Sequence, residues 1–478
     1  MTQTESAPVG GWAELLGPKN LGASTVLAGG VALYATNEFL TVSLLPSTVA
    51  DIGGERLYAW VTTVYLVASV VAATTVSSVL TKLGPRYAYV SGLGVFGIGS
   101  ALCAVAPSME FLLLGRVVQG AAGGLLAGLG YAVISSALPQ SLWTKASALV
   151  SAMWGVGTLV GPAAGGLFAQ FGSWRWAFGV LALLAAAMAA LVPFALPGRA
   201  ADADRPVADR IPVWSLMLLG TAALAISVAG IPRNVGVTAG LLVAGAALVA
   251  VFLVVDRKTT ASVLPPKAFA PGPLKWIYLT LGVLMAATMA DMYVPLFGQR
   301  LAHLVPVAAG FLSVSLAVGW TISEIISASL TRTRVIVSVV AAAPLVMAVG
   351  LGVAAVSQLE DAPGVVIAVW VVALLITGTG VGVAWPHLSA WAMGSSDDPA
   401  EGRTAAAAIN TVQLICGAFG AGLAGIVVNL TDRGDATAAR WMFAVMAVLA
   451  AVGCIASYRS SRGRTADRRV SAERHGHG

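Results

Sequence analysis

The sequence is poor in charge: only 10% of its 478 residues are Asp, Glu, Lys or Arg, whereas about a quarter of a soluble globular protein is charged. With 58% apolar residues and a mean hydropathy of +0.86, the chain could not cover its own surface with polar groups in water. The low charge and high apolar content also exclude intrinsic disorder, and the 54 glycines follow no period of three, which excludes collagen. The composition predicts an integral membrane protein.

The chain also lacks the motifs of several soluble classes. Its three cysteines lie inside apolar runs, so we expect neither a structural disulfide nor a metal site. No G-x-x-x-x-G-K-[ST] motif is present, and the GLGVFG run at 92–97 matches a dinucleotide pattern without a preceding strand. The four histidines are too scattered for a metal site or a triad, and the dispersed basic residues argue against nucleic-acid binding. We therefore expect no cofactor, no metal and no nucleic acid.

Long apolar stretches are the main feature that is present. About 20 apolar residues cross about 30 Å of hydrocarbon as a helix, and these stretches do not alternate as β-barrel strands would. The first 21 residues are too polar for a signal peptide. The prediction is an all-α integral membrane fold with fourteen transmembrane helices, at approximately 22–50, 58–80, 87–106, 111–138, 144–170, 175–196, 212–231, 236–255, 276–299, 304–330, 334–356, 364–387, 403–430 and 438–457.

Basic residues predict the orientation of the chain in the membrane. With the N-terminus inside, twenty of the 27 Lys and Arg residues fall on inner segments and six on outer ones. An excess of Lys and Arg marks the cytoplasmic side. Both termini are therefore expected in the cytoplasm of a cell whose inner, or plasma, membrane holds the protein.

Polar interruptions divide the chain into seven parts. Two six-helix bundles around a central path are typical of secondary transporters, and the extra pair between them is interpreted as an insertion. The parts are a cytoplasmic N-terminal segment 1–21, an N-terminal bundle 22–198, a cytoplasmic linker 199–211, an inserted helix pair 212–255, a second linker 256–275, a C-terminal bundle 276–457 and a basic cytoplasmic tail 458–478.

Glu38 lies near the middle of the first predicted span, where a charge costs roughly 2.5–3.5 kcal/mol on insertion scales. Tyr34, Asn37 and Thr41 surround it at helical spacing, which predicts a polar stripe facing protein or a water-filled cavity. A carboxyl group in a partly apolar setting can change charge near working pH. We expect Glu38 to couple protons or contact substrate; the alternative is a structural hydrogen bond.

Two further acids lie within predicted spans. Asp291 has Thr288 one turn before it, and Met285 and Met292 nearby could form an adaptable apolar wall of a substrate cavity, or ordinary packing. On the same energetic ground, Asp291 is a second candidate for proton coupling. Glu324 is closer to a span end, so it could line the cavity or reach the interface.

Arg116 is the one basic residue inside a span, with Gln119 one turn later. An acid partner from another helix, most plausibly Glu38, would lower the cost of keeping this cation in the membrane. The alternative is snorkelling to the outer surface, because long basic side chains can do this near helix ends. We expect Arg116 to take part in proton coupling and Gln119 to line the cavity.

Small residues mark the fifth predicted span. Gly157, Gly161 and Gly165 recur every four residues, so they predict one face on which a neighbouring helix approaches closely. Pro162 removes a backbone hydrogen bond and can bend the span. With Gly166, these residues form a candidate gating and packing motif, although static packing would need the same pattern.

This arrangement resembles the major facilitator superfamily, and within it the 14-helix drug:proton antiporter branch. The run GTLVGPAAGG at 157–166 is similar to the antiporter motif, and RVVQG at 116–120 is similar to the motif whose arginine is linked to proton transfer. Two features depart from the family. The usual helix 1 aspartate is replaced by Asn37, with Glu38 adjacent, and the loop at 77–86 lacks the gating aspartate.

Together these features predict a proton-coupled secondary antiporter that exports lipophilic or amphipathic compounds by alternating access. Its partners would be small lipophilic or amphipathic substrates, protons and membrane lipids. Export of an endogenous lipid, siderophore or peptide, or uptake by proton symport, remains an alternative within the same class. A membrane-embedded enzyme is disfavoured, because the three intramembrane acids lie at different depths with no nucleophile or metal set.

Overall fold

The computed structural model describes residues 11–197, 212–231, 234–259, 262–393, 399–431 and 434–475. Every regular element in these ranges is a helix, and no strand occurs among them. The chain divides into two compact units: unit 1 holds residues 1–54 and 68–211, and unit 2 holds residues 55–67 and 212–478. The predicted linker 199–211 and the first ten residues lie outside the described residues.

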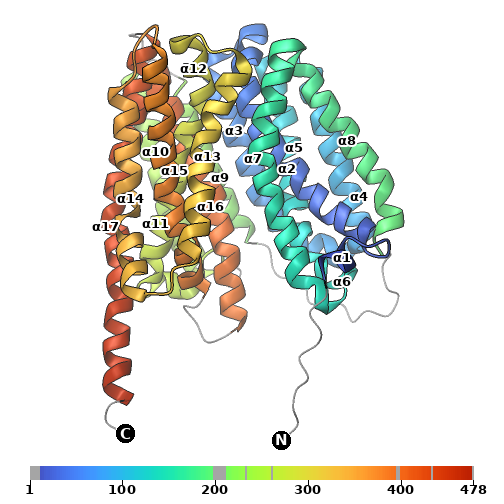
Figure 1. The fold of residues 1–478 in the computed structure, drawn as a ribbon. Coiled ribbons are helices and arrows are strands. Elements are labelled where there is room, and N and C mark those ends of the chain that lie inside the picture. The colour runs from blue at the N-terminus through green and yellow to red at the C-terminus, as the bar shows by residue number, and fades with distance from the viewer. Residues whose placement is uncertain are drawn as a thin grey trace, which may run out of the picture. The chain divides into compact units, whose positions relative to one another are not determined.

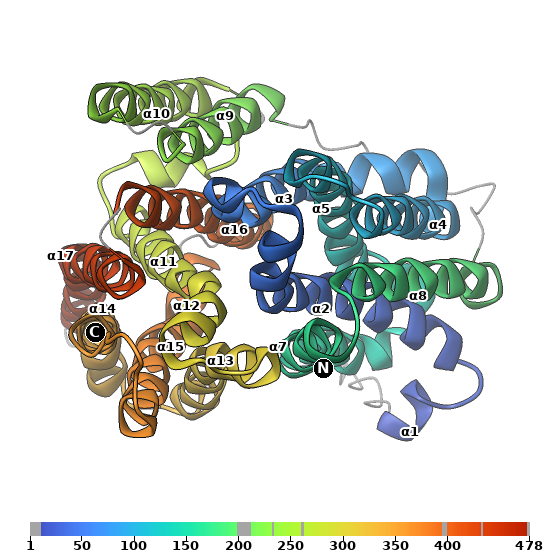
Figure 2. The same cartoon turned by 90° about the horizontal axis from the view of Figure 1, so that it is seen from above.

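Unit 1 is a bundle of long helices (Figures 1 and 2). In it α2 packs on α5, α7 and α8, and α4 packs on α5 and α8. Ser108 and Ser173 cap α5 and α8, where each hydroxyl accepts a hydrogen bond from a backbone N–H of the first turn. The helices are α1 (Trp12–Leu15), α2 (Leu21–Ile52), α4 (Val76–Ala104), α5 (Met109–Ala132), α6 (Ile134–Ala137), α7 (Trp143–Phe171) and α8 (Trp174–Ala195), with η2 (Gln140–Leu142) before α7.

Unit 2 is built around three helices, α15, α16 and α17, each of which packs on two others. Here α15 packs on α13 and α14, α17 packs on α14 and α11, and α16 packs on α11 and α9. Its elements are η1 (Glu55–Leu57), the first part of α3 (Tyr58–Ala73), α9 (Val213–Ala229), α10 (Val235–Lys258), η3 (Pro266–Phe269), α11 (Leu274–Thr288), η4 (Met289–Tyr293), α12 (Val294–Ala302), α13 (Pro306–Ala328), α14 (Thr333–Val356), α15 (Gly364–Met393), α16 (Pro399–Leu430) and α17 (Asp435–His475).

Helix ends differ from the predicted spans at several places. The predicted span 58–80 ends at Ala73, and the next helix, α4, begins at Val76. A kink at Gly84, whose φ is 75°, then interrupts α4. Only glycine adopts this backbone conformation readily, and Pro85 disfavours a helical conformation in the residue before it. The predicted loop between the second and third spans is therefore a bend within a helical segment.

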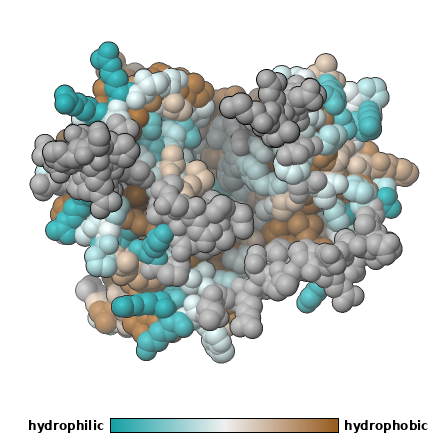
Figure 3. Space-filling model, turned by 90° about the horizontal axis from the view of Figure 1, so that it is seen from below, coloured by the Kyte–Doolittle hydropathy of each residue, from teal (hydrophilic) through white to brown (hydrophobic). Residues whose placement is uncertain are grey.

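Large apolar side chains cover the outside of both units. Phe194 is 89% exposed and Val356 is 80% exposed, which a soluble monomer would not tolerate over so wide a surface. The face seen from below in Figure 3 mixes hydrophilic side chains with apolar ones. Among the described residues, twelve helices are long and apolar enough to cross a membrane. The chain is a multi-pass membrane protein.

The number of spans stays a prediction. Helix α9 has only 17 residues, and α2, whose polar stripe lowers its hydropathy, is not among the twelve. Both occupy predicted spans, and α11, η4 and α12 together occupy the predicted ninth span. Fourteen helical segments thus lie where spans were expected, while twelve meet the criteria of length and hydropathy.

Candidate functional site

A cluster of hydrogen-bonded polar side chains lies in the interior of unit 1. The Arg116 guanidinium on α5 donates from Nη1 to Gln119 Oε1 at 2.9 Å and to Asn37 Oδ1 of α2 at 3.3 Å. Gln119 Nε2 donates to Asn37 Oδ1 at 3.3 Å and to Ser100 Oγ of α4 at 2.8 Å. Arg116 is 1% exposed, and Asn37, Gln119 and Ser100 are fully buried. Arg116 does not snorkel to the surface; three helices contribute to a cluster around it.

Glycines allow this contact between α4 and α5. A Cβ atom on Gly99 would lie 2.6 Å from the Gln119 backbone N, and one on Gly115 would lie 2.9 Å from the Cys103 backbone N. Both distances are well below the 3.5–4.0 Å optimum between non-bonded atoms, so side chains larger than glycine would separate the helices. The close approach brings Ser100 within reach of Gln119.

Glu38 follows Asn37 on α2, and one of its two carboxyl oxygens has no hydrogen-bond partner among the described residues. The residue is half-buried, and its Oε2 atom is inaccessible and has no hydrogen-bond partner among the described residues. Two neutral amide side chains accept the guanidinium hydrogen bonds given above. Burying an ionised carboxylate without partners is costly, so this setting favours a carboxyl group that can take up a proton.

The polar stripe predicted on α2 takes shape around these residues. Thr41 Oγ1 donates to the Asn37 backbone carbonyl at 2.7 Å, and Thr41 is buried. Tyr34 is 1% exposed and meets the Trp154 ring edge-on at 5.4 Å. Asn37, at the position of the family aspartate, therefore faces Arg116, while the acid stands one residue later.

The glycine face of α7 packs directly on α2. A Cβ atom on Gly157 would lie 2.6 Å from Ala35 Cβ, and one on Gly161 would lie 2.6 Å from Phe39 Cβ. A Cβ atom on Gly165 would lie 2.7 Å from the Leu40 carbonyl oxygen. The backbones of α2 and α7 are therefore in contact along three turns, directly behind the stripe that carries Glu38.

The proline of this motif joins the same contact. The Pro162 carbonyl accepts a hydrogen bond from Ser43 Oγ of α2 at 3.3 Å, and Gly166 is buried beside it. The residues of the predicted gating and packing motif thus lie together on one helix pair. Whether this pair moves during function stays a prediction.

In unit 2, Asp291 stands where a span is interrupted. It lies in the 3-10 turn η4 between α11 and α12. Pro295 has no N–H to donate to the Asp291 carbonyl four residues earlier, and the Val294 N–H bonds to it instead. The Asp291 Oδ1 atom is buried and has no hydrogen-bond partner among the described residues.

The residues predicted around Asp291 are also buried. Met285 is 9% exposed, Met292 is 3% exposed and Thr288 is 3% exposed. The Thr288 hydroxyl donates to the Met285 carbonyl at 2.6 Å and is thereby engaged within its own helix. The Thr288 hydroxyl is therefore not free to bind the Asp291 carboxyl group as a donor.

Glu324 belongs to a separate aromatic cluster in unit 2. Trp320 Nε1 donates to Glu324 Oε2 at 2.9 Å, and the Trp320 ring lies 5.4 Å from the Trp385 ring of α15. Glu324 is half-buried. It is held at the edge of an aromatic pair, and no pattern in the sequence indicated that Trp385 would join it.

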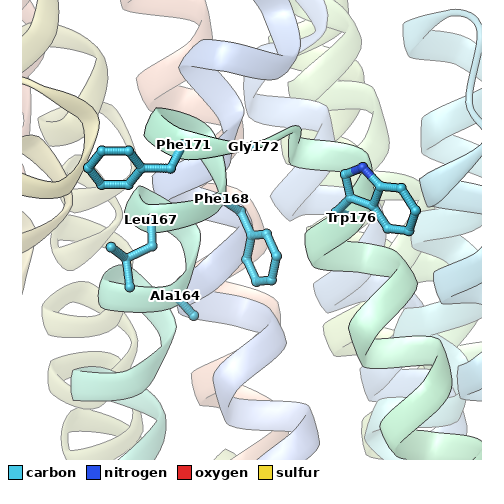
Figure 4. Close-up of a pocket in the computed structure, with 6 residues that line it drawn as sticks. All are labelled: Ala164, Leu167, Phe168, Phe171, Gly172 and Trp176. Atoms are coloured by element: carbon cyan, nitrogen blue, oxygen red, sulfur yellow. The ribbon is translucent and has the colours of Figure 1, made fainter.

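An apolar cavity of about 430 Å³ lies elsewhere in unit 1, between the end of α7 and the start of α8 (Figure 4). It contains none of the predicted site residues. It is lined by Ala164, Leu167, Phe168, Phe171, Gly172 and Trp176. The described residues hold no group of three or more His, Cys, Asp or Glu side chains that could bind a metal ion.

Sequence reasoning missed two contributors to the unit 1 cluster. Ser100 accepts from Gln119, and Cys103 Sγ lies 3.5 Å from Gln119 Oε1. Both occupy α4 at a spacing of three residues, next to Gly99. The sequence pattern that could have indicated them is a polar residue next to a glycine on an apolar helix. Such a glycine lets a neighbouring helix approach closely, so the polar side chain can reach a partner on that helix.

Comparison with known proteins identifies relatives over almost the whole chain. The family model described as Major Facilitator Superfamily matches residues 27–421. The chain is 64% identical over 465 residues to a "Probable multidrug-efflux transporter" of Mycobacterium tuberculosis, with 96% of this chain and 98% of that protein covered. It is 25% identical over 401 residues to the "Multidrug transporter protein MdtP" of Bacillus subtilis, with 81% and 73% covered.

Solved structures share the fold. A D-xylose-proton symporter superposes with a TM-score of 0.63, covering 93% of this chain and 99% of that chain at 14% identity. The nucleoside transporter NupG superposes with a TM-score of 0.59 over 91% of this chain and 98% of that one, also at 14% identity.

Proposed function

The chain belongs to the major facilitator superfamily, and from this we propose that it is a proton-coupled antiporter that exports lipophilic or amphipathic compounds, as multidrug-efflux proteins do. A member of this transporter family with transporter structures as its neighbours is a transporter and not an enzyme. The name of the 64% identical mycobacterial relative supports export of drug-like compounds.

One observation carries the proton coupling: the Glu38 carboxyl group has an inaccessible oxygen that lacks a hydrogen-bond partner among the described residues. Glu38 follows Asn37, which accepts a hydrogen bond from the buried Arg116. The amide groups of Asn37 and Gln119 accept hydrogen bonds from Arg116, which leaves Glu38 able to exist with or without its proton. In the proposed cycle, Glu38 takes a proton from outside and releases it inside, and substrate competes for the same cavity.

Asp291 is proposed as a second coupling group in the C-terminal half of the chain. Its support is the same combination of burial and an oxygen without a partner among the described residues. The polar stripe on α2 and the methionines of α11 and η4 are proposed, each within its own unit, to contact substrate. Glu324 would contribute a carboxyl group at the aromatic pair. The glycine motif of α7 would let α2 and α7 move as one rigid pair.

The remaining features of the proposal concern the membrane. Two cytoplasmic termini are supported by the bias of basic residues. Fourteen spans and a location in the inner or plasma membrane are proposed with them. The six-two-six organisation of bundle, inserted pair and bundle belongs to the same proposal, as does a substrate that is a small lipophilic or amphipathic molecule.

Proton-driven transport in everted membrane vesicles tests the role of Glu38. The Glu38→Gln variant keeps the shape of the side chain but cannot carry a proton on and off, so acid-driven accumulation of an amphipathic dye is expected to be lost. Glu110→Gln, at the exposed start of α5, is the matched control and should transport as the wild type does. Coupled transport at the wild-type rate by Glu38→Gln would refute the role, and the direction of dye movement separates export from symport.

A further inference from the structure

Helix α3 is shared by the two units. Residues 58–67 of this helix pack within unit 2, and residues 68–73 pack within unit 1. The two ends of one 16-residue helix are therefore held by different bodies. A rearrangement in which these bodies move would have to bend α3 or release one of its two ends.

The end in unit 1 is held by backbone contact. Ser69 Oγ donates to the Gly120 carbonyl of α5 at 2.9 Å. A Cβ atom on Gly124 would lie 2.1 Å from the Ser69 carbonyl oxygen. The main chains of α3 and α5 are therefore in direct contact at this end.

The end in unit 2 rests on α9, the first helix of the inserted pair. The Trp60 indole Nε1 donates to the Ser227 carbonyl at 3.1 Å, and Ser227 Oγ donates to Thr63 Oγ1, also at 3.1 Å. Further along, a Cβ atom on Gly220 would lie 3.1 Å from Val67 Cγ1. A Cβ atom on Gly425 of α16 would lie 2.6 Å from Ala59 Cβ, so α16 also packs closely on this end of α3. Thr63 is fully buried.

Polar contacts at the start of α3 complete this attachment. Glu55 forms an ion pair with Arg300 of α12, and Asn429 of α16 donates to the Arg56 carbonyl at 2.9 Å. The Tyr58 ring stacks on Tyr293 with centroids 4.7 Å apart. Exposed ion pairs and single hydrogen bonds are easily exchanged for water, so they can break and form again.

We propose that α9 of the inserted helix pair is a docking site, called the seat below, for residues 58–67 of α3. These residues leave the seat and return to it during each transport cycle. The proposal rests on alternating access by the proposed transporter. It gives the inserted pair a mechanical role, in which Ser227 and Gly220 define one docked position of α3. The backbone contact at Ser69 keeps the other end of α3 attached throughout. The inserted pair is thus part of the moving machinery.

A reversible cross-link tests whether α3 must leave the seat. In a protein whose native cysteines are replaced by alanine, Thr63→Cys and Ser227→Cys place two thiols where the hydroxyls now touch. Oxidation is expected to link them and stop vesicle transport, and a reductant is expected to restore it; each single variant is the control for oxidation. A fully cross-linked protein that still transports at the reduced rate would overturn the proposal.

A second readout needs no transported compound, so it separates this proposal from the proposed function. Thr63→Cys and Thr377→Cys are matched, because both threonines are fully buried in unit 2 and donate to the carbonyl four residues earlier. If the seat is empty in roughly 0.1–10% of molecules, a maleimide labels Cys at position 63 about 10- to 1,000-fold more slowly than a free thiol. The thiol at position 377 stays protected. Equal protection at both positions would overturn the proposal even if drug export is confirmed.

Discussion

The contact between α2 and α7 can be tested by one methyl group. Gly161→Ala adds a Cβ atom 2.6 Å from Phe39 Cβ and 2.9 Å from the Leu40 backbone N. Carbon atoms pack best at about 3.5–4.0 Å, so the helices must separate by roughly 1 Å. The opposing atoms belong to the backbone and to a Cβ atom, which cannot rotate away as the end of a long side chain can.

The size of the effect follows from this geometry. Overpacking a tight interior costs about 1–3 kcal/mol. Gly155 lies on the same helix but has no atom within 4 Å of an added Cβ, and alanine there restricts the unfolded chain, a gain of about 0.4–1 kcal/mol. The free energies of unfolding of the two Gly→Ala variants should thus differ by about 1.4–4 kcal/mol, with opposite signs relative to wild type.

Unfolding of the purified protein by SDS titration measures this difference, because both variants change the same residue type in the same helix. Gly161→Ala should unfold at lower SDS and Gly155→Ala at the wild-type concentration or higher. If the two midpoints coincide, α2 and α7 do not approach as closely as described, and the packing argument for the glycine motif fails. Replacing Gly161 by leucine in the same assay should deepen the loss.

Two further predictions concern buried polar groups. Gln119→Leu removes the acceptor 2.9 Å from the Arg116 guanidinium, so the free energy of unfolding should fall by roughly 1–2 kcal/mol; an unchanged SDS midpoint would contradict the cluster. Asp256, which is 1% exposed, accepts backbone hydrogen bonds from Val263 and Leu264 at 2.7 and 2.9 Å. Asp256→Ala should therefore speed proteolysis of the 256–275 linker more than Asp256→Asn, which keeps one acceptor, and equal cleavage of the two would count against this.

Much of the architecture could be predicted from the sequence because the membrane imposes length and hydropathy on each span. Helical segments occupy every predicted span, and the glycines of α7 lie where this helix approaches α2 closely. The 3-10 turn at 289–293 was not predicted. Pro295 showed that one hydrogen bond would be lost, but how the preceding turn adjusts depends on its packing against other helices.

The candidate site was only partly accessible to such reasoning. The cost of burying charge was enough to single out Glu38, Asp291 and Arg116. It could not show that Arg116 would be held by Asn37 and Gln119, because partners on different helices depend on helix rotation. Asn37, which departs from the family pattern, accepts a hydrogen bond from Arg116 through its amide oxygen.

The 3-10 turn η4 alters the angular phase of everything that follows it. Each 3-10 residue turns about 120° where an α-helical residue turns about 100°, so the five residues of η4 add roughly 100° of rotation. A helical wheel that treats 274–302 as one continuous α-helix therefore places the side chains of α12 on the wrong face of the helix. If the residues of this stretch are replaced by cysteine one at a time, the positions accessible to a thiol reagent should recur at a shorter spacing from Met289 on. From Val294 on they should recur at the α-helical spacing again, offset by about a quarter turn.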